Sequence, residues 1–223
     1  MPLIKLSNIT KSYPDGENHL NHVLRHIDIE IAKAEFVAIK GTSGSGKTTL
    51  LSILGTLLLP DSGSYLLDEK EMTTPGVDHS LVRNKQIGFV FQDHRLMPQY
   101  TALENILLPT LAYNSKTSTE ENKYAHHLLE LTHIAYVANQ YPHTLSGGEA
   151  SRVAVCRALM MKPLLLLADE PTGQLDAENA RNIAGLLGEI NKNLQTTIVM
   201  VTHSDETSSV AHRILTLKDG KLQ

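Results

Sequence analysis

The chain of 223 residues lacks the features that would place it in an oxidising compartment or within a membrane. Its single cysteine, Cys156, excludes an internal disulfide framework, and we expect it to be a small buried residue. The formal net charge is only −4, so no basic surplus favours binding to nucleic acid or an anionic lipid surface. The longest apolar stretch, residues 50–59, is interrupted by small and polar residues and is about half as long as a membrane span.

The beginning of the chain shows no targeting pattern. Residues 1–5 do not place a basic segment before an apolar one, so we expect no secretory signal peptide. These absences together predict a cytoplasmic protein that does not cross a membrane by itself. Any role at a membrane then requires another polypeptide.

Hydrophobic periodicity predicts strands near both ends of the chain and helices in its middle. Strands that alternate with helices predict an α/β fold with a mostly parallel sheet, here with an antiparallel β region at the N-terminus. We expect one domain, with residues 1–92 and 162–223 forming the core and residues 93–161 forming an inserted helical subdomain. The expected strands are 3–9, 23–31, 35–40, 86–91, 164–168, 197–202 and 214–217; the expected helices are 48–58, 103–113, 119–132, 148–161 and 177–193.

A complete phosphate-binding loop, G-x-x-x-x-G-K-[ST], occupies residues 41–48. Its glycines let backbone N–H groups turn toward phosphate oxygens, and the helix that follows directs its positive end at the same anion. Lys47 is placed to reach the β- and γ-phosphates, and the Thr48 hydroxyl to reach Mg²⁺. The alternative is a glycine-rich turn without nucleotide, but the loop lies between an expected strand and an expected helix, as binding requires. The expected phosphate contacts are Gly41, Thr42, Ser43, Gly44, Ser45, Gly46, Lys47, Thr48 and Thr49.

Two carboxylates, Asp169 and Glu170, end the apolar run that begins at residue 164. In a parallel sheet, ligands bind beyond the carboxyl ends of the strands, so both side chains should emerge beside the phosphates. Asp169 can help to hold Mg²⁺, and Glu170 can accept a proton from an attacking water. The alternative is a strand that ends in a polar turn. With the phosphate loop, the pair predicts a P-loop NTPase core.

The segment Leu145-Ser146-Gly147-Gly148-Glu149 narrows this prediction. By itself it reads as a capped helix start, but it lies between the phosphate loop and the carboxylate pair. In that order, the sequence resembles the ABC (ATP-binding cassette) ATPase family, whose signature is LSGGQ or LSGGE. Like the phosphate loop, the segment offers N–H groups, a hydroxyl and the positive end of a helix.

The resemblance implies roles for four more residues. Gln92 matches the family's glutamine that senses the γ-phosphate and helps to hold Mg²⁺ with Thr48 and Asp169. His203 matches the switch histidine of the family, and Asp176 matches its D-loop aspartate. Tyr13 matches the aromatic residue whose ring stacks on adenine. It also implies a homodimer, paired head to tail by ATP. Each ATP would lie between Lys47 of one subunit and the signature residues Ser146, Gly147 and Gly148 of the other.

The resemblance covers essentially the whole chain and is strongest to the LolD/MacB group of ABC ATPases. It implies a partner, a separately encoded membrane permease that exports lipoproteins, peptides or drugs or transmits force, and a location at the inner face of the cell membrane. Part of the apolar stretch 96–108 is expected to be exposed and to bind that permease. One difference from the family is that Ala150 and Ser151 stand where its members usually carry Arg or Gln.

Two other classes of protein remain as alternatives. An ABC ATPase that acts on a soluble or nucleic-acid partner usually has a coiled-coil insertion or a second cassette, and this chain has neither. A GTP switch needs an N-K-x-D motif, and residues 191–194 lack its aspartate. A metal site at His19, His22 and His26 is not expected either, because no Cys or carboxylate stands at ligand spacing.

Overall fold

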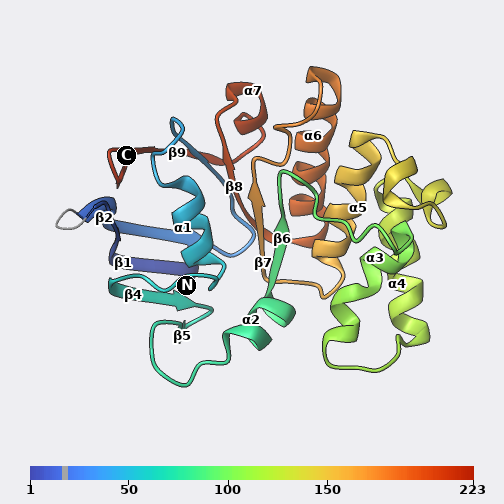
Figure 1. The fold of residues 1–223 in the computed structure, drawn as a ribbon, viewed down its shortest axis with the longest axis horizontal. Coiled ribbons are helices and arrows are strands. Elements are labelled where there is room, and N and C mark those ends of the chain that lie inside the picture. The colour runs from blue at the N-terminus through green and yellow to red at the C-terminus, as the bar shows by residue number, and fades with distance from the viewer. Residues whose placement is uncertain (17–19) are drawn as a thin grey trace.

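The computed structural model describes residues 1–16 and 20–223, and it contains two sheets with helices packed around them (Figure 1). Residues 17–19, which include His19, lie outside the described part. Helix α1 lies between the two sheets, and the helices of the middle of the chain lie on the far side of the larger one (Figure 1). Among the described residues, no helix combines the length and apolar character that a membrane span requires.

The smaller sheet is antiparallel, with the strand order β2-β1-β4-β5. Its inward side chains alternate along the strands, as a sheet with one buried face requires. The pairing of β1 with β2 is interrupted near Asn8 and His26, which both have positive φ. The strands are β1 (Pro2–Pro14), β2 (Leu20–Ala32), β4 (Ser62–Leu67) and β5 (Lys70–Glu71).

The larger sheet has the order β10-β9-β3-β8-β7-β6 and is parallel except for the pair β9 and β10. Its central strands are apolar except at their ends and are buried on both faces, which is typical of a parallel sheet covered by helices. The predicted α/β fold is therefore confirmed. The strands are β3 (Phe36–Lys40), β6 (Ile87–Val90), β7 (Leu165–Asp169), β8 (Thr197–Thr202), β9 (Arg213–Lys218) and β10 (Lys221–Leu222).

Each expected helix is present, with shifted ends. The expected helix 103–113 stops being α-helical at Leu107, because Pro109 cannot donate an N–H, and continues as a 3₁₀ turn. The sequence analysis did not identify α2, α7, β4, β5 or β10. The helices are α1 (Lys47–Leu54), α2 (His79–Gln86), α3 (Ala102–Leu107), η1 (Leu108–Ala112), α4 (Thr119–Leu131), η2 (Ala135–Val137), η3 (Pro142–Thr144), α5 (Gly147–Leu159), α6 (Ala177–Leu194) and α7 (Asp205–Ser208).

The parallel sheet separates two apolar cores. One core joins α1, the antiparallel sheet and one face of the parallel sheet, and within it the buried Tyr65 hydroxyl donates to the carbonyl of Leu54 over 2.7 Å. The other joins the opposite face to α3, α4, α5 and α6 and includes the fully buried Cys156. Helix α5 lies so close to β6 that a Cβ on Gly88 would collide with the carbonyl oxygen of Ala158.

Candidate functional site

The glycine-rich loop connects the end of β3 to the start of α1. Gly46 caps α1 with φ 101°, and a Cβ there would lie 2.9 Å from the side chain of Val23. Lys47 is only 8% exposed, and its Nζ donates to the carbonyls of Gly41 at 2.8 Å and Thr42 at 2.9 Å. The lysine therefore holds the loop curled around the first turn of α1, with its charge at the N-terminus of that helix.

The loop also contains a buried polar atom with no partner among the residues that the structure describes. This atom is the hydroxyl oxygen of Ser45, and a Cβ on Gly41 would lie 2.5 Å from it. A buried hydroxyl without a hydrogen bond is costly, so it favours a ligand that accepts one. A phosphate oxygen meets that requirement.

Two carboxylates lie at the carboxyl end of β7. Glu170 has a left-handed backbone, with φ 46°, and its N–H donates to the carbonyl of Val201 over 3.0 Å. Its Oε2 is hydrogen-bonded to Nδ1 of His203, which follows β8. Burial and the neighbouring Glu170 raise the pKa of the Asp169 carboxyl, whereas Lys47 acts in the opposite direction. The pair combines one carboxylate shielded from water with one held by a histidine.

A cavity of about 560 Å³ brings most of the predicted site together. Its lining contains the two carboxylates, Gln92, His203 and most of the glycine-rich loop. The predicted residues that line it are Ser43, Gly44, Gly46, Lys47, Thr48, Thr49, Gln92, Asp169, Glu170 and His203. These residues come from the ends of β3, β6, β7 and β8, so the carboxyl ends of four neighbouring strands of one sheet supply the site.

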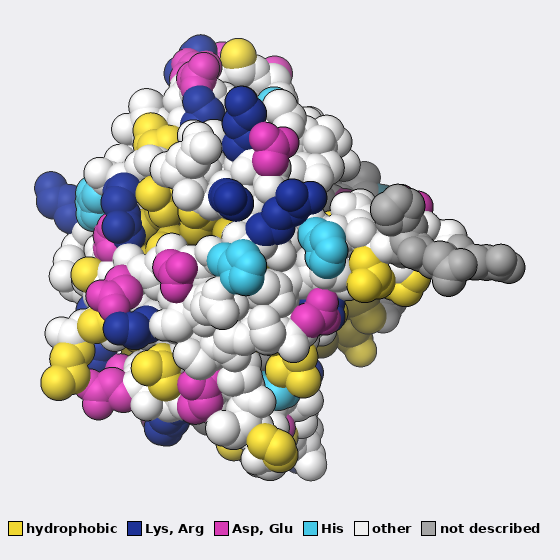
Figure 2. All heavy atoms as spheres, turned by 90° about the vertical axis from the view of Figure 1, so that its left-hand side faces the viewer, with side chains coloured by type: hydrophobic (Ala, Val, Ile, Leu, Met, Phe, Trp, Pro, Cys, Tyr) yellow, Lys and Arg dark blue, Asp and Glu magenta, His cyan; other side chains and the backbone are white. Residues whose placement is uncertain are grey.

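A second cavity, of about 700 Å³, shares Ser43, Gly44 and His203 with the first and is also lined by Gly41, Thr42 and Ser45. Its remaining lining is rich in cations and includes Arg25, Lys40 and Lys218. The space-filling view shows Lys and Arg side chains gathered beside histidines on this side of the molecule (Figure 2). The basic lining makes this region of the surface attractive to anions.

Five predicted residues line neither of these two cavities. Tyr13, on β1, is 39% exposed, and the Nζ of Lys11 lies 5.9 Å from the centre of its ring. Asp176 caps α6, where its carboxylate accepts from the N–H groups of Glu178 and Asn179. The other three are the signature residues Ser146, Gly147 and Gly148.

The signature residues begin helix α5 on a different part of the surface. Ser146 caps the helix, and its N–H and hydroxyl both donate to Glu149 over 2.7 Å. The second carboxylate oxygen of Glu149 accepts from Tyr136 over 2.8 Å. A Cβ on Gly148 would lie 2.9 Å from Oδ1 of Asn179, so the start of α5 packs directly against the start of α6.

The sequence analysis did not identify the residues that hold the Gln92 loop. Arg157, on α5, donates to the carbonyls of His94 and Arg95, each over 2.6 Å. Nε2 of His94 is hydrogen-bonded to the hydroxyl of Ser151 over 2.6 Å. These contacts span more than fifty residues of sequence, so no local pattern could have indicated them.

The fold and the loop define the class of the protein. A mostly parallel sheet in which β3 leads through a glycine-rich loop into α1 is the core of the P-loop NTPases. The sequence profile of the ABC transporter family matches residues 24–173, about two thirds of the chain. The chain belongs to the ABC transporter family, and it is an ATPase of the type that this family contains.

Curated relatives match along nearly the whole chain. The lipoprotein-releasing system ATP-binding protein LolD of Saccharophagus degradans is 40% identical over 222 residues, which cover 99% of this chain and 96% of that protein. LolD of Aquifex aeolicus is 45% identical over 201 residues, 90% of this chain and 89% of the relative. An uncharacterised ABC transporter ATP-binding protein of Bacillus subtilis, YvrO, is 40% identical over 99% of this chain and 95% of its own length.

Solved structures agree with the fold. The ATP-binding cassette MJ0796, in a dimeric post-hydrolysis state bound to ADP and phosphate, superposes with a TM-score of 0.88 at 38% identity. The alignment covers 99% of this chain and 96% of the cassette. The protein cbiO1 of Clostridium perfringens, part of the ABC transporter complex cbiONQ, also gives a TM-score of 0.88, at 30% identity, over all of this chain and 87% of its own.

Proposed function

We propose that this chain is the ATP-hydrolysing subunit that drives a separate membrane permease of the lipoprotein-releasing type. The observation that supports it most directly is the cavity that joins Lys47, Thr48, Asp169 and Glu170 at the carboxyl edge of the parallel sheet. The names of the relatives in Saccharophagus degradans and Aquifex aeolicus support the substrate class, a lipoprotein. The permease would hold the chain at the cytoplasmic face of the inner membrane.

In this proposal, the loop at residues 41–49 binds the phosphates of ATP, and the Tyr13 ring stacks on adenine. Lys47 moves from the carbonyls of Gly41 and Thr42 to the β- and γ-phosphates, since a phosphate oxygen is a stronger partner for an ammonium group than a carbonyl. The hydroxyl of Ser45 gains the acceptor that it lacks among the described residues. Both changes make ATP binding favourable without a change in the fold of the loop.

The Thr48 hydroxyl, the Asp169 carboxylate and the Gln92 amide would hold Mg²⁺. All three supply oxygen donors, the kind that this ion prefers, and all three line the same cavity. Burial raises the pKa of the Asp169 carboxyl above its usual value. A divalent cation beside this carboxyl would act in the opposite direction and favour its ionised form. Bound Mg²⁺ supplies positive charge that neutralises the phosphates.

Glu170 would act as the general base. Its carboxylate takes a proton from the water whose oxygen bonds to the γ-phosphorus, while the bond from that phosphorus to the bridging oxygen breaks and releases ADP and phosphate. His203 holds Oε2 of Glu170 in position. Gln92 lines the same cavity and senses the γ-phosphate. Positioning and charge neutralisation account for most of the catalysis.

A second copy of the chain would complete each site. Ser146 and Gly147 are exposed and do not line the cavity of their own subunit, so they are available to the ATP of a partner. The dimeric form of MJ0796 supports this pairing. The substitution Ser146→Arg tests it: a bulky cation should prevent closure and abolish hydrolysis while the monomer still binds ATP. Loss of ATP binding by the monomer would show that Ser146 serves its own pocket.

The boundary between the core and the helical subdomain, proposed as residues 93–161, would carry the permease contact. The apolar stretch 96–108 is divided: Ile106 is fully buried, whereas Met97 is 43% exposed. Near it, a cavity of about 500 Å³ is lined by residues of α2, β6 and α5 and by Arg95 of the Gln92 loop. We place a short cytoplasmic helix of the permease in this cavity. Its lining combines apolar and cationic side chains, including Leu57, Arg83, Phe89, Phe91, Arg95, Pro109, Arg157 and Met161.

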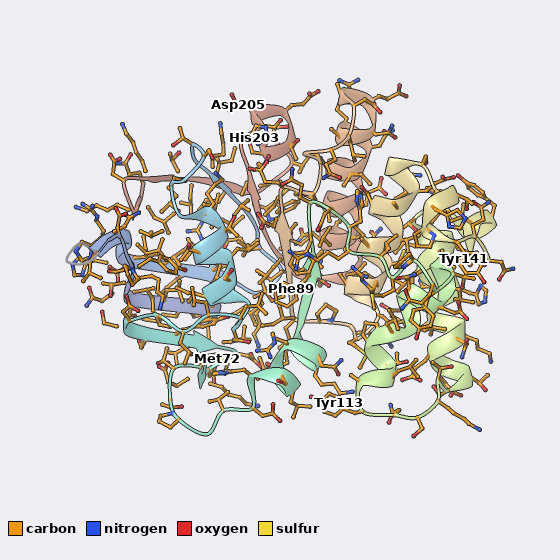
Figure 3. The ribbon with its side chains drawn as sticks, in the orientation of Figure 1. Met72, Phe89, Tyr113, Tyr141, His203 and Asp205 are labelled. Carbon is orange, nitrogen blue, oxygen red and sulfur yellow. The ribbon has the colours of Figure 1, made fainter. Side chains whose placement is uncertain are left out.

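Figure 3 shows Phe89, which lines this cavity, beside β6 in the middle of the view, and Tyr141 at the outer side of the helical block. The test is to reconstitute the chain with its permease in proteoliposomes and measure stimulation of ATPase activity. Leu57→Asp should remove the stimulation and leave the basal rate, because Leu57 is 53% exposed and lines the cavity. Tyr141→Asp, at a residue 44% exposed, is the matched control. Equal stimulation of both variants would exclude this surface.

A further inference from the structure

The loop that contains Gln92 has an unusual backbone. His94 and Arg95 follow one another with φ 57° and 47°, the left-handed region that residues other than glycine rarely occupy. Each such residue carries a conformational cost and persists only where surrounding contacts hold it in place. Here two left-handed residues follow one another next to Gln92, which lines the ATP cavity. This indicates that contacts with other elements hold the loop in place.

Helix α5 supplies the contacts that fix the loop. Arg157 holds the carbonyls of His94 and Arg95, and burial lowers the pKa of its guanidinium. One and a half turns earlier on the same helix, the Ser151 hydroxyl meets Nε2 of His94 over 2.6 Å, and Ser151 is only 1% exposed. Arg157 anchors the loop through main-chain atoms, so only the His94 contact depends on which side chain the loop carries.

The same imidazole also lies against the signature segment. Burial lowers the pKa of the His94 imidazole, whereas the backbone of Gly147 acts in the opposite direction. Helix α5 begins at Gly147, and its cap is Ser146. A single side chain therefore joins the Gln92 loop to the first turn of the helix whose N-terminus is offered to the partner subunit.

We propose that His94 is a positioning residue that couples the two ATP sites of the dimer, through its hydrogen bond to Ser151. The inference rests on the proposed function. Gln92 contacts the γ-phosphate in its own subunit, so the position of its loop depends on the bound nucleotide. Through His94, a shift of this loop moves α5. Helix α5 in turn presents Ser146 and Gly147 to the ATP of the partner. The small Ser151 side chain leaves room for the imidazole against the helix.

The coupling is measured as ATP-driven dimerisation in a Glu170→Gln background, which keeps ATP intact. His94→Ala should leave the affinity of the monomer for a fluorescent ATP analogue unchanged. It should raise the protein concentration needed for dimerisation by between about twofold and tenfold, the change that one hydrogen bond of ordinary strength controls. In the otherwise native chain, kcat should fall by a similar factor, with KM unchanged.

Three variants separate positioning from a general structural role. His133→Ala is the matched control, because His133 also has a left-handed backbone, with φ 58°, but is exposed on another loop. His94→Gln should restore most of the dimerisation, since its amide nitrogen can reach the place of Nε2. Ser151→Ala should reproduce the loss, and the double variant should be no worse than either single one, because both remove the same bond.

The proposal is overturned if His94→Ala dimerises like His133→Ala, or if the effects of His94→Ala and Ser151→Ala add. It is also overturned if His94→Gln melts like the native protein yet fails to recover dimerisation. Failure of the proposed function gives a different result. In that case the unmodified chain hydrolyses no ATP, or Lys47→Ala hydrolyses it at the native rate, whatever residue occupies position 94.

Discussion

The substitution Glu170→Gln removes the proposed general base while it keeps the size of the side chain and the shape of the site. Glutamine has the size of glutamate, and both pay the same cost for the left-handed backbone at this position, φ 46°. The amide can keep a hydrogen bond to Nδ1 of His203, so the loop after β7 should not move. What is lost is the negative charge of the carboxylate and, with it, the capacity to accept a proton from water.

The size of the effect follows from that loss. A positioned general base contributes about 10²- to 10⁴-fold to a rate, which corresponds to about 3 to 5.5 kcal/mol of activation free energy. We therefore expect single-turnover hydrolysis of ATP to slow by at least about a hundredfold, while the melting temperature changes by less than about 1 °C. Because ATP then persists, Mg²⁺ and ATP should convert the variant from monomer to stable dimer in size-exclusion chromatography.

The matched control is Glu130→Gln, which removes an exposed carboxylate from α4, remote from the cavity. It should hydrolyse ATP at the native rate and dimerise only transiently. A turnover of Glu170→Gln within tenfold of the native rate would refute the assignment of the general base. A variant that stays monomeric with saturating ATP would refute the shared site, even if hydrolysis were slow.

Three further outcomes are expected. Lys47→Ala should reduce ATP hydrolysis by at least about a hundredfold in a steady-state assay, because no other ammonium group of the described residues lies in the phosphate cavity; native turnover would contradict the phosphate role. Tyr65→Phe leaves the buried carbonyl of Leu54 without its partner, so it should cost about 2 kcal/mol and lower the melting temperature by about 4–8 °C, with ATP affinity unchanged. Burial raises the pKa of the Cys156 thiol to about 12, so at pH 8 a thiol reagent should label the native protein only through unfolding, and rapid labelling without denaturant would show that the helical core opens.

The parts of the fold and site that could be predicted are those that short, continuous segments of sequence determine. The glycine-rich loop, the strand before it and the helix after it follow from residues 36–54, where turn chemistry and apolar patterning agree. The strands β7 and β8 are uninterrupted apolar runs, which only a buried parallel sheet accommodates. Local composition was sufficient because these elements depend little on distant contacts.

Other elements could not be predicted for physical reasons. Helix α2 has no buried residues and contains only two apolar ones, Leu81 and Val82, so its apolar signal is weak, and the Asp78 cap marks its start. Strand β4 begins at Ser62-Gly63, two residue types that favour a turn. Its pairing with β1 nevertheless makes this segment a strand. The contact between His94 and Ser151 joins residues 57 positions apart, and only the packed fold brings them together.

The close approach of α5 to β6 has a consequence for how relatives of this protein vary. At position 88 any side chain larger than hydrogen would push the helix off the sheet, whatever nucleotide chemistry the protein performs. Natural variation should therefore hold glycine there as strictly as it holds the phosphate-binding lysine. An alignment alone would rank the two positions equally, yet one is fixed by the reaction and the other by the distance between two backbones.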